Sequence, residues 1–264
     1  MDDSDGTAAV GADPSLDVLP DRTPASASPR TRKVSTMVAA AIVEDIVSQG
    51  HEAGARLAVE AAMVERFRVS RASVREGLRL LETHGVIDLR PGQRGGPVVR
   101  ELVAGDLART LTLFFRLTNA TYRDVVEARI VIEPVMARLA AERQDADQLA
   151  RLRELVEHPA ERRNTMGSAQ DFHDTMSSAS GNPVLDILGK ALRMVYAGHL
   201  QAENFFPADA AGGIADQHQD IADAIFAGDG PLTEQLVADH LRDYADLQDA
   251  RTPWLMDKRV VWDA

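Results

Sequence analysis

Three arginines spaced four residues apart form the clearest pattern for chemistry in this chain. Arg71, Arg75 and Arg79 would lie one above another on one face of a helix. A guanidinium group can donate two hydrogen bonds together to O6 and N7 of a guanine. Ser70 stands where the N-cap residue of such a helix belongs. The spacing therefore predicts a recognition helix that reads the major groove of DNA.

Three histidines form a second candidate site. His173, His218 and His240 each fall on a different expected helix, among apolar neighbours. Helices that face one another in a bundle can bring such side chains together. Three converging imidazoles would bind Zn²⁺, Ni²⁺ or a similar ion, so one divalent metal ion is predicted. Two alternatives stay open: a metal-free polar pocket, and three separate histidines within the core.

The composition excludes several other kinds of protein. The chain has no cysteine, which excludes disulfides, thiolate metal sites and a cysteine nucleophile. No run of 18 apolar residues and no secretory signal is present, so we expect a cytoplasmic protein without a membrane partner. The net charge is −12, yet twelve basic and eight acidic residues leave segment 30–100 at +4. Because salt screens charge beyond about 8–10 Å, the acidic remainder does not forbid DNA binding.

Three helices and a hairpin are expected to position the arginines. Helical period and capping residues predict helices at 34–48, 60–67 and 70–84. Short apolar runs on either side of a turn predict strands at 86–90 and 97–100. In the turn, Gly92 would let the backbone approach DNA, and Arg94 can reach a phosphate or the minor groove. Three helices followed by a hairpin make a winged helix-turn-helix.

The rest of the chain is expected to be an all-α antiparallel helical bundle, so that the fold class is mainly α. Helical period predicts seven more helices, joined by short loops that favour antiparallel neighbours: 103–118, 121–142, 145–157, 166–180, 183–204, 214–228 and 231–250. The low aromatic content of 5% agrees with helices rather than a β-sandwich. The predicted organisation is a disordered tail, a winged helix domain, a helical domain and a C-terminal tail: 1–29, 30–100, 101–250 and 251–264.

Short motifs in both parts of the chain occur in an order and spacing that one family shares. In the first part they are Phe67–Arg71, Val74–Leu81 and Gly85–Ile87. In the second part they are Glu127–Arg129, Glu133–Pro134, Phe172–His173, Ala179–Pro183, His218, Ala224–Ile225, Gly228–Asp229 and His240–Leu241. With these motifs the chain resembles the GntR family of bacterial transcription regulators, in particular its FadR-like subfamily with an all-helical FCD-type effector domain.

The resemblance implies a homodimer that binds a pseudo-palindromic double-stranded DNA operator. It assigns base reading to Arg71 and Arg75, while short donors such as Ser70 and Ser73 suit phosphates and Arg79 suits the DNA backbone. One departure is Ala61, at a position where family members usually carry arginine. We therefore expect an operator that differs from those of the relatives.

The resemblance also implies that the helical domain binds a small effector, a carboxylate or an acyl-type ligand. Many relatives hold a metal with three histidines and an aspartate four residues before the first histidine. Here that position is Ala169, and Asp171 points about 200° away from the required face. Water or effector oxygens would then complete the shell of three histidines. Arg129 would face the effector and pair with a carboxylate; the alternative is an intrahelical pair with Glu133.

The predicted function is that of an effector-controlled, sequence-specific DNA-binding regulator, a repressor and not an enzyme. An all-α metalloenzyme that uses the three histidines is one alternative, although no HExxH-type pairing is present. A DNA-binding dimer without any effector is the other.

Overall fold

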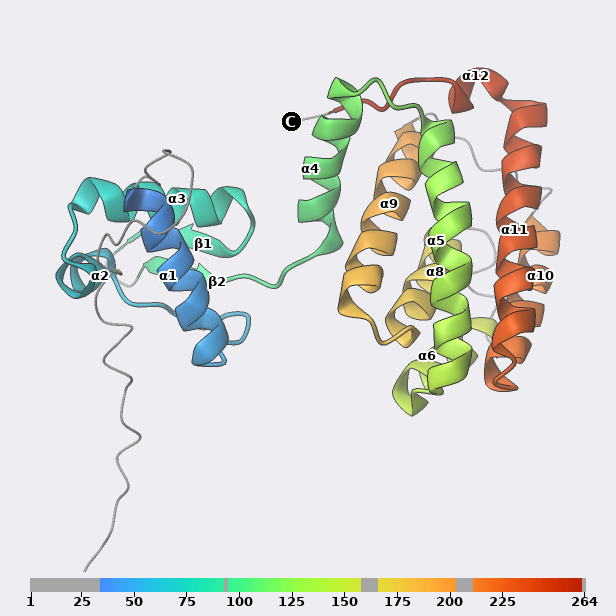
Figure 1. Cartoon of the computed structure of the whole chain (residues 1–264), viewed down its shortest axis with the longest axis horizontal. Coiled ribbons are helices and arrows are strands. Elements are labelled where there is room, and N and C mark those ends of the chain that lie inside the picture. The colour runs from blue at the N-terminus through green and yellow to red at the C-terminus, as the bar shows by residue number, and fades with distance from the viewer. Residues whose placement is uncertain (1–33, 93–94, 158–165, 203–210, 263–264) are drawn as a thin grey trace, which may run out of the picture. The chain divides into compact units, whose positions relative to one another are not determined.

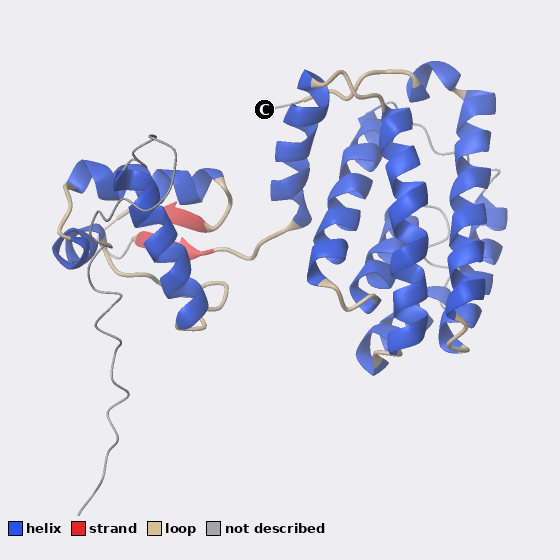
Figure 2. Cartoon of the chain, in the orientation of Figure 1, coloured by secondary structure: helices blue, strands red, loops and turns tan. Residues whose placement is uncertain are grey.

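The chain divides between Leu102 and Val103 into two compact units, and each is described by itself (Figure 1). The computed structural model describes residues 34–92, 95–157, 166–202 and 211–262. The predicted tail 1–29 and the wing residue Arg94 lie outside the described residues. Among these residues helices dominate both units, and the described strands form a single two-stranded sheet in the N-terminal unit (Figure 2). The predicted mainly α class is confirmed.

The N-terminal unit has the element order of a winged helix-turn-helix. Its elements are α1 (Val34–Ser48), α2 (Glu60–Phe67), α3 (Arg71–Thr83), β1 (Ile87–Arg90) and β2 (Gly96–Val99). The strands pair antiparallel, with Ile87 opposite Val99 and Arg90 opposite Gly96. Each of these predicted elements is present, and their ends differ from the prediction by at most one residue.

Helix α3 is held against α1 by its apolar face. The stripe of Val74, Leu78 and Leu81 is buried in one cluster with residues of α1 and α2. Gly77 allows the two helices to approach, because a Cβ there would lie 2.9 Å from the backbone oxygen of Ser35. With its apolar face buried in this way, α3 turns its arginines toward solvent.

The C-terminal unit is a helical bundle around a long central helix, α5. Its described helices are α4 (Ala104–Leu117), α5 (Tyr122–Arg143), α6 (Ala146–Glu157), α8 (Met166–Ala179), α9 (Pro183–Ala202), α10 (Ala211–Phe226), α11 (Gly230–Arg251) and α12 (Pro253–Met256). Helix α5 packs against α8, α9 and α11, and α4 packs against α9 (Figure 1). Among the described helices, none combines the length and apolar composition needed to cross a membrane.

The prediction of a C-terminal tail from residue 251 is wrong for the residues that the structure describes. Helix α11 runs on to Arg251, and the following residues, Thr252–Trp262, pack onto the bundle; we call them the C-terminal strap. Leu255, Met256 and Val260 are buried in a cluster shared with α4, α5 and α9. Three apolar residues around a four-residue helix are too few to show a period, which is why sequence reasoning missed them.

Candidate functional site

The arginine face of α3 is open to solvent. Arg71, Arg75 and Arg79 are all exposed, and Ser70 caps the helix by accepting a hydrogen bond from the Ser73 backbone N–H at 3.1 Å. The hydroxyl oxygens of Ser70 and Ser73 lie 2.9 Å apart at the start of the same face. Guanidinium groups and serine hydroxyls thus lie together at the first turns of the helix, the part of a recognition helix that contacts base edges in the major groove.

One contact on this face was missed by sequence reasoning. Arg75 donates from Nε to Oε2 of Glu60 at 3.0 Å, and the Arg75 side chain is still 70% exposed. The two residues are fifteen positions apart on different helices, so no helical spacing could have indicated the pair. In the wing, Gly92 has φ +102°, a backbone conformation that favours glycine.

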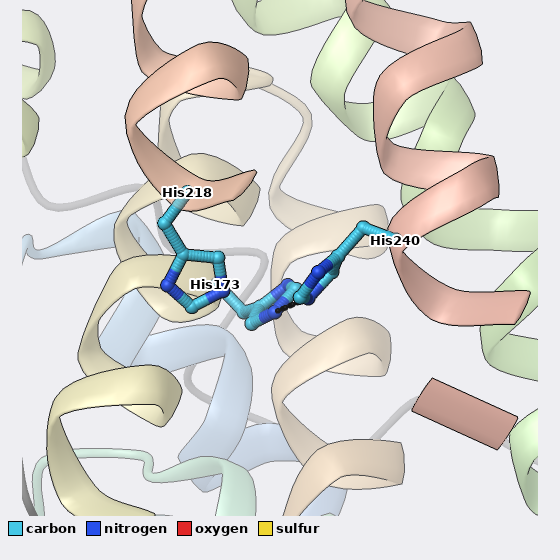
Figure 3. A group of neighbouring side chains, drawn as sticks. All are labelled: His173, His218 and His240. Atoms are coloured by element: carbon cyan, nitrogen blue, oxygen red, sulfur yellow. Dashed lines mark hydrogen bonds between the residues drawn. The ribbon is translucent and has the colours of Figure 1, made fainter. Parts of the chain in front are cut away.

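The three predicted histidines converge in the interior of the C-terminal unit. His173 comes from α8, His218 from α10 and His240 from α11, and one ring nitrogen of each lies within 4.8 Å of the other two (Figure 3). The Nε2 atoms of His173 and His240 lie 3.3 Å apart. About that separation is expected between two nitrogens on a tetrahedral zinc ion with Zn–N bonds of 2.0–2.1 Å.

The outer partners of the histidines orient their lone pairs toward one another. His240 Nδ1 lies 2.8 Å from Gln217 Oε1, and His173 Nδ1 lies 2.9 Å from Glu133 Oε2. Gln217 Oε1 accepts from His240 Nδ1, and the Glu133 carboxylate beside His173 Nδ1 favours the proton on that nitrogen as well, so both Nε2 lone pairs face inward. His218 Nε2 is buried and has no hydrogen-bond partner among the described residues. A cation between these nitrogens would satisfy all three rings.

The electrostatics of the cluster favour neutral imidazoles. Burial lowers the pKa of His240 to about 3 and that of His218 well below its ordinary value. Burial also lowers the pKa of His173, although Glu133 opposes the shift. Burial would raise the pKa of Glu133, but Arg129, Arg193 and His173 outweigh it and hold that pKa well below its usual range. The histidines are therefore in the form that binds metal, beside a buried carboxylate.

The described residues contribute no carboxylate directly to the three-histidine cluster. Ala169 lines the adjacent cavity, as its spacing from His173 implies, and it offers no ligand atom. Asp171 is exposed on the other side of α8, as expected from its spacing. The residues present fit a metal site with three protein nitrogens and an open position.

Two buried arginines stand beside the histidines. Arg129 donates from Nε to Glu133 Oε1 at 2.6 Å, so it forms the intrahelical pair and also lines the cavity. Arg193 donates from Nε to Asp174 at 2.8 Å and from Nη2 to Ser177 at 2.9 Å. Its buried Nη1 lies 3.5 Å from Glu133 Oε1 and makes no hydrogen bond within the described part of the chain.

The arginines and histidines share one cavity of about 70 Å³. Its chemically active lining comes from α5, α8, α9, α10 and α11: Arg129, His173, Arg193, Tyr196, His218, His240 and Tyr244. Sequence reasoning did not assign Arg193 or Tyr244 to this site. The sequence offers one weak signal, and it concerns Arg193 alone: Arg193 and Tyr196 are three residues apart, on one face of the predicted helix.

Comparison with known proteins agrees with this two-part organisation. Residues 34–95 match the bacterial regulatory proteins of the gntR family, and residues 124–243 match the FCD domain. The chain is 30% identical over 209 residues to the HTH-type transcriptional regulator Mce2R of Mycobacterium tuberculosis, covering 75% of this chain and 84% of that protein. It is 27% identical over 224 residues to a putative L-lactate dehydrogenase operon regulatory protein of Escherichia coli, covering 80% and 84%.

A solved structure has the same fold. The GntR protein of Streptococcus agalactiae superposes with a TM-score of 0.62 at 23% identity, covering 80% of this chain and 99% of that one. The arginine-bearing winged helix, the helical domain with its histidine cluster and these matches lead to one conclusion. The chain belongs to the GntR family of bacterial regulatory proteins and is a DNA-binding transcriptional regulator with an FCD domain.

Proposed function

We propose that this regulator is a repressor that binds a pseudo-palindromic operator as a homodimer and is controlled by a small organic acid. One observation carries the proposal: two buried arginines and three histidines, on five helices, face a single cavity. Among these groups, Arg193 Nη1 and His218 Nε2 are buried without a hydrogen-bond partner in the described part of the chain, which is costly unless a ligand compensates them. An anion bound beside a divalent cation would do so.

On the DNA side, Arg71 and Arg75 would read guanines, since both are exposed at the start of α3. Ser70, Ser73 and Arg79 would contact phosphates and set the register of the helix. In the wing, Gly92 would let the backbone approach the DNA, and Arg94 would contact a phosphate or the minor groove.

On the effector side, His173, His218 and His240 would hold a divalent ion such as Zn²⁺ or Ni²⁺. When bound, the metal supplies a positive charge and open positions for oxygen ligands. Arg129 and Arg193 would orient the carboxylate of the effector through charge-assisted hydrogen bonds. The E. coli relative is named for an L-lactate dehydrogenase operon, which makes short hydroxy acids the first candidates.

Selection of binding sites from a random duplex library tests the operator and the homodimer together. We expect the full-length protein to select two half-sites related by two-fold symmetry and to protect both from nuclease, because each protomer presents one α3. Sedimentation of the complex should give two protein chains per duplex. A selected site without two-fold symmetry, or one chain per duplex, would contradict the proposal.

Substitution of Arg193 tests the effector site. In Arg193→Met the cavity loses its unpartnered donor, so releasing operator DNA should require at least tenfold more acid, measured with L-lactate and a series of short hydroxy acids. Operator affinity without acid should stay unchanged. Arg138→Met is the matched control, because Arg138 is an exposed arginine on α5 that pairs with Glu142. Equal release by acid in both variants would remove Arg193 from the effector site.

A further inference from the structure

The C-terminal strap is anchored by main-chain hydrogen bonds to the corner where α4 passes into α5. The Tyr122 N–H donates to the Lys258 carbonyl at 3.1 Å, and the Val260 N–H donates to the Ala120 carbonyl at 2.9 Å. The Val261 N–H donates to the Tyr122 hydroxyl at 3.2 Å. Figure 1 shows this red segment running back from α12 across the end of α5 toward α4. The strap and the corner thus pair as an isolated antiparallel bridge between Thr121 and Arg259.

An ion pair network fixes the same segment from the side. Arg123 donates from Nη1 to Asp249 on α11 at 2.6 Å and from Nη2 to Asp257 in the strap at 2.7 Å. One guanidinium group at the start of α5 therefore joins the end of α11 to the strap. Asp257 is 66% exposed, so this contact orients the strap more than it stabilises it.

The inner side of the strap touches the wall of the effector cavity. The Tyr196 hydroxyl donates to Met256 Sδ at 3.8 Å, and the Tyr196 side chain lines the cavity. The guanidinium carbon of Arg129 lies 5.4 Å from the centre of the Tyr196 ring. Tyr196 therefore has the arginine of the cavity on its face and the strap at its hydroxyl.

The same apolar cluster continues from this wall to α4. Tyr196, Met256, Val260 and Tyr122 are buried together, and Ala108 of α4 belongs to the cluster. Helix α4 begins at Ala104, directly after the boundary between the two units. Close-packed interiors have low compressibility and transmit strain. A contiguous packed path thus joins the cavity to the first helix that follows the DNA-binding unit.

We propose that the C-terminal strap couples the effector cavity to the α4–α5 corner, so that a ligand which moves Tyr196 also moves the corner. The coupling rests on the effector function proposed above. The coupling is reciprocal: if a ligand in the cavity changes the strap, then a change in the strap also changes the cavity wall, even without a ligand. The strap lies beyond the matched FCD region, which ends at residue 243.

Hydrogen exchange of two shortened chains tests this without any ligand. A chain that ends after Met256 lacks the strap's bonds to the corner, whereas a chain that ends after Val261 keeps them. In the first, we expect amides of residues 120–126 and of the cavity wall, residues 192–197, to exchange at least tenfold faster than in the full chain. In the second, both regions should exchange at the full-chain rate.

Faster exchange confined to residues 120–126 would overturn the coupling, because the strap would then stabilise the α4–α5 corner without affecting the cavity wall. If the chain ending after Met256 fails to fold, Val260→Ala in the full chain removes buried strap contacts more gently. Faster exchange of both residues 120–126 and 192–197 in this variant would support the coupling, and faster exchange of residues 120–126 alone would overturn it.

Tryptophan fluorescence supplies the matching test with a ligand. The chain has two tryptophans, Trp254 and Trp262, and both lie in the strap. Addition of ZnCl₂, with binding followed separately by calorimetry, should change the emission in the wild type. Zinc that binds without changing the emission would overturn the coupling. An absence of zinc binding would contradict the proposed metal site, and the hydrogen-exchange experiment would still test whether the strap is coupled to the cavity.

Discussion

Replacing Arg71 or Arg75 with alanine is expected to lower the affinity for the selected operator by about 1–3 kcal/mol each. That range corresponds to a loss of about 5- to 150-fold. Each substitution removes a guanidinium group from the exposed face of α3, while the buried stripe of Val74, Leu78 and Leu81 stays intact. Titration of labelled operator with each variant measures the loss, and thermal unfolding should show a fold as stable as that of the wild type.

The pair with Glu60 makes the two arginines unequal. Arg75→Ala leaves the Glu60 carboxylate without the Arg75 guanidinium, close to where DNA phosphates would lie, so it should cost more than Arg71→Ala. Adding Glu60→Gln to Arg75→Ala should restore part of the affinity, because the remaining repulsion is removed. If the double variant binds the operator no more tightly than Arg75→Ala alone, the Glu60 carboxylate does not repel the DNA.

The controls separate base reading from general attraction. Arg138→Ala removes an exposed arginine from α5 and should leave operator affinity unchanged. Arg79→Ala should weaken binding to all duplexes alike and reduce the salt dependence of binding by about one phosphate contact. If Arg71→Ala and Arg75→Ala both bind the operator like the wild type, α3 does not read the bases.

Helical period predicted the long elements because it depends on local spacing alone. The apolar stripe of α3 and the ends of its neighbours followed from residues within one or two turns of each other. The strap did not follow, because Val260 is buried by partners on α4, α5 and α9 that lie far away in the sequence. A residue buried by distant partners carries no periodic signal of its own.

The candidate sites show the same division. The convergence of His173, His218 and His240 could be predicted, since each histidine stood out among apolar neighbours. Arg193 could not be, because a period shows that a residue lies on one face of a helix but not which helix that face meets. The contact of Arg75 with Glu60 depends on how α2 packs against α3, which no spacing within either helix contains.

ZnCl₂ is expected to raise the melting temperature of the full chain by about 5–10 °C when its concentration is about 100 times the dissociation constant. Binding at that excess stabilises the folded state by about 2.7 kcal/mol, and 1 kcal/mol shifts the midpoint of a unit this size by about 2–4 °C. In His218→Phe the shift should disappear. Phenylalanine keeps the ring stacked on Phe172, 4.1 Å away between centroids, but offers no nitrogen.

The control for this experiment is His84→Ala, which removes an exposed histidine of the N-terminal unit and should leave the zinc shift unchanged. A shift that survives in His218→Phe would place the metal elsewhere or exclude His218 from its ligands. Competition with a chelator of known affinity then gives the dissociation constant for each variant.

Ala169→Asp is the complementary change, because it should add a ligand instead of removing one. Ala169 lines the cavity one helical turn before His173, so a carboxylate there can reach the same ion. We expect zinc to bind at least tenfold more tightly in this variant. The acid should at the same time become less effective in releasing operator, because the new carboxylate takes the open position and adds negative charge beside Arg129 and Arg193. Tighter zinc binding with an unchanged acid response would show that the acid does not use the position that alanine leaves open.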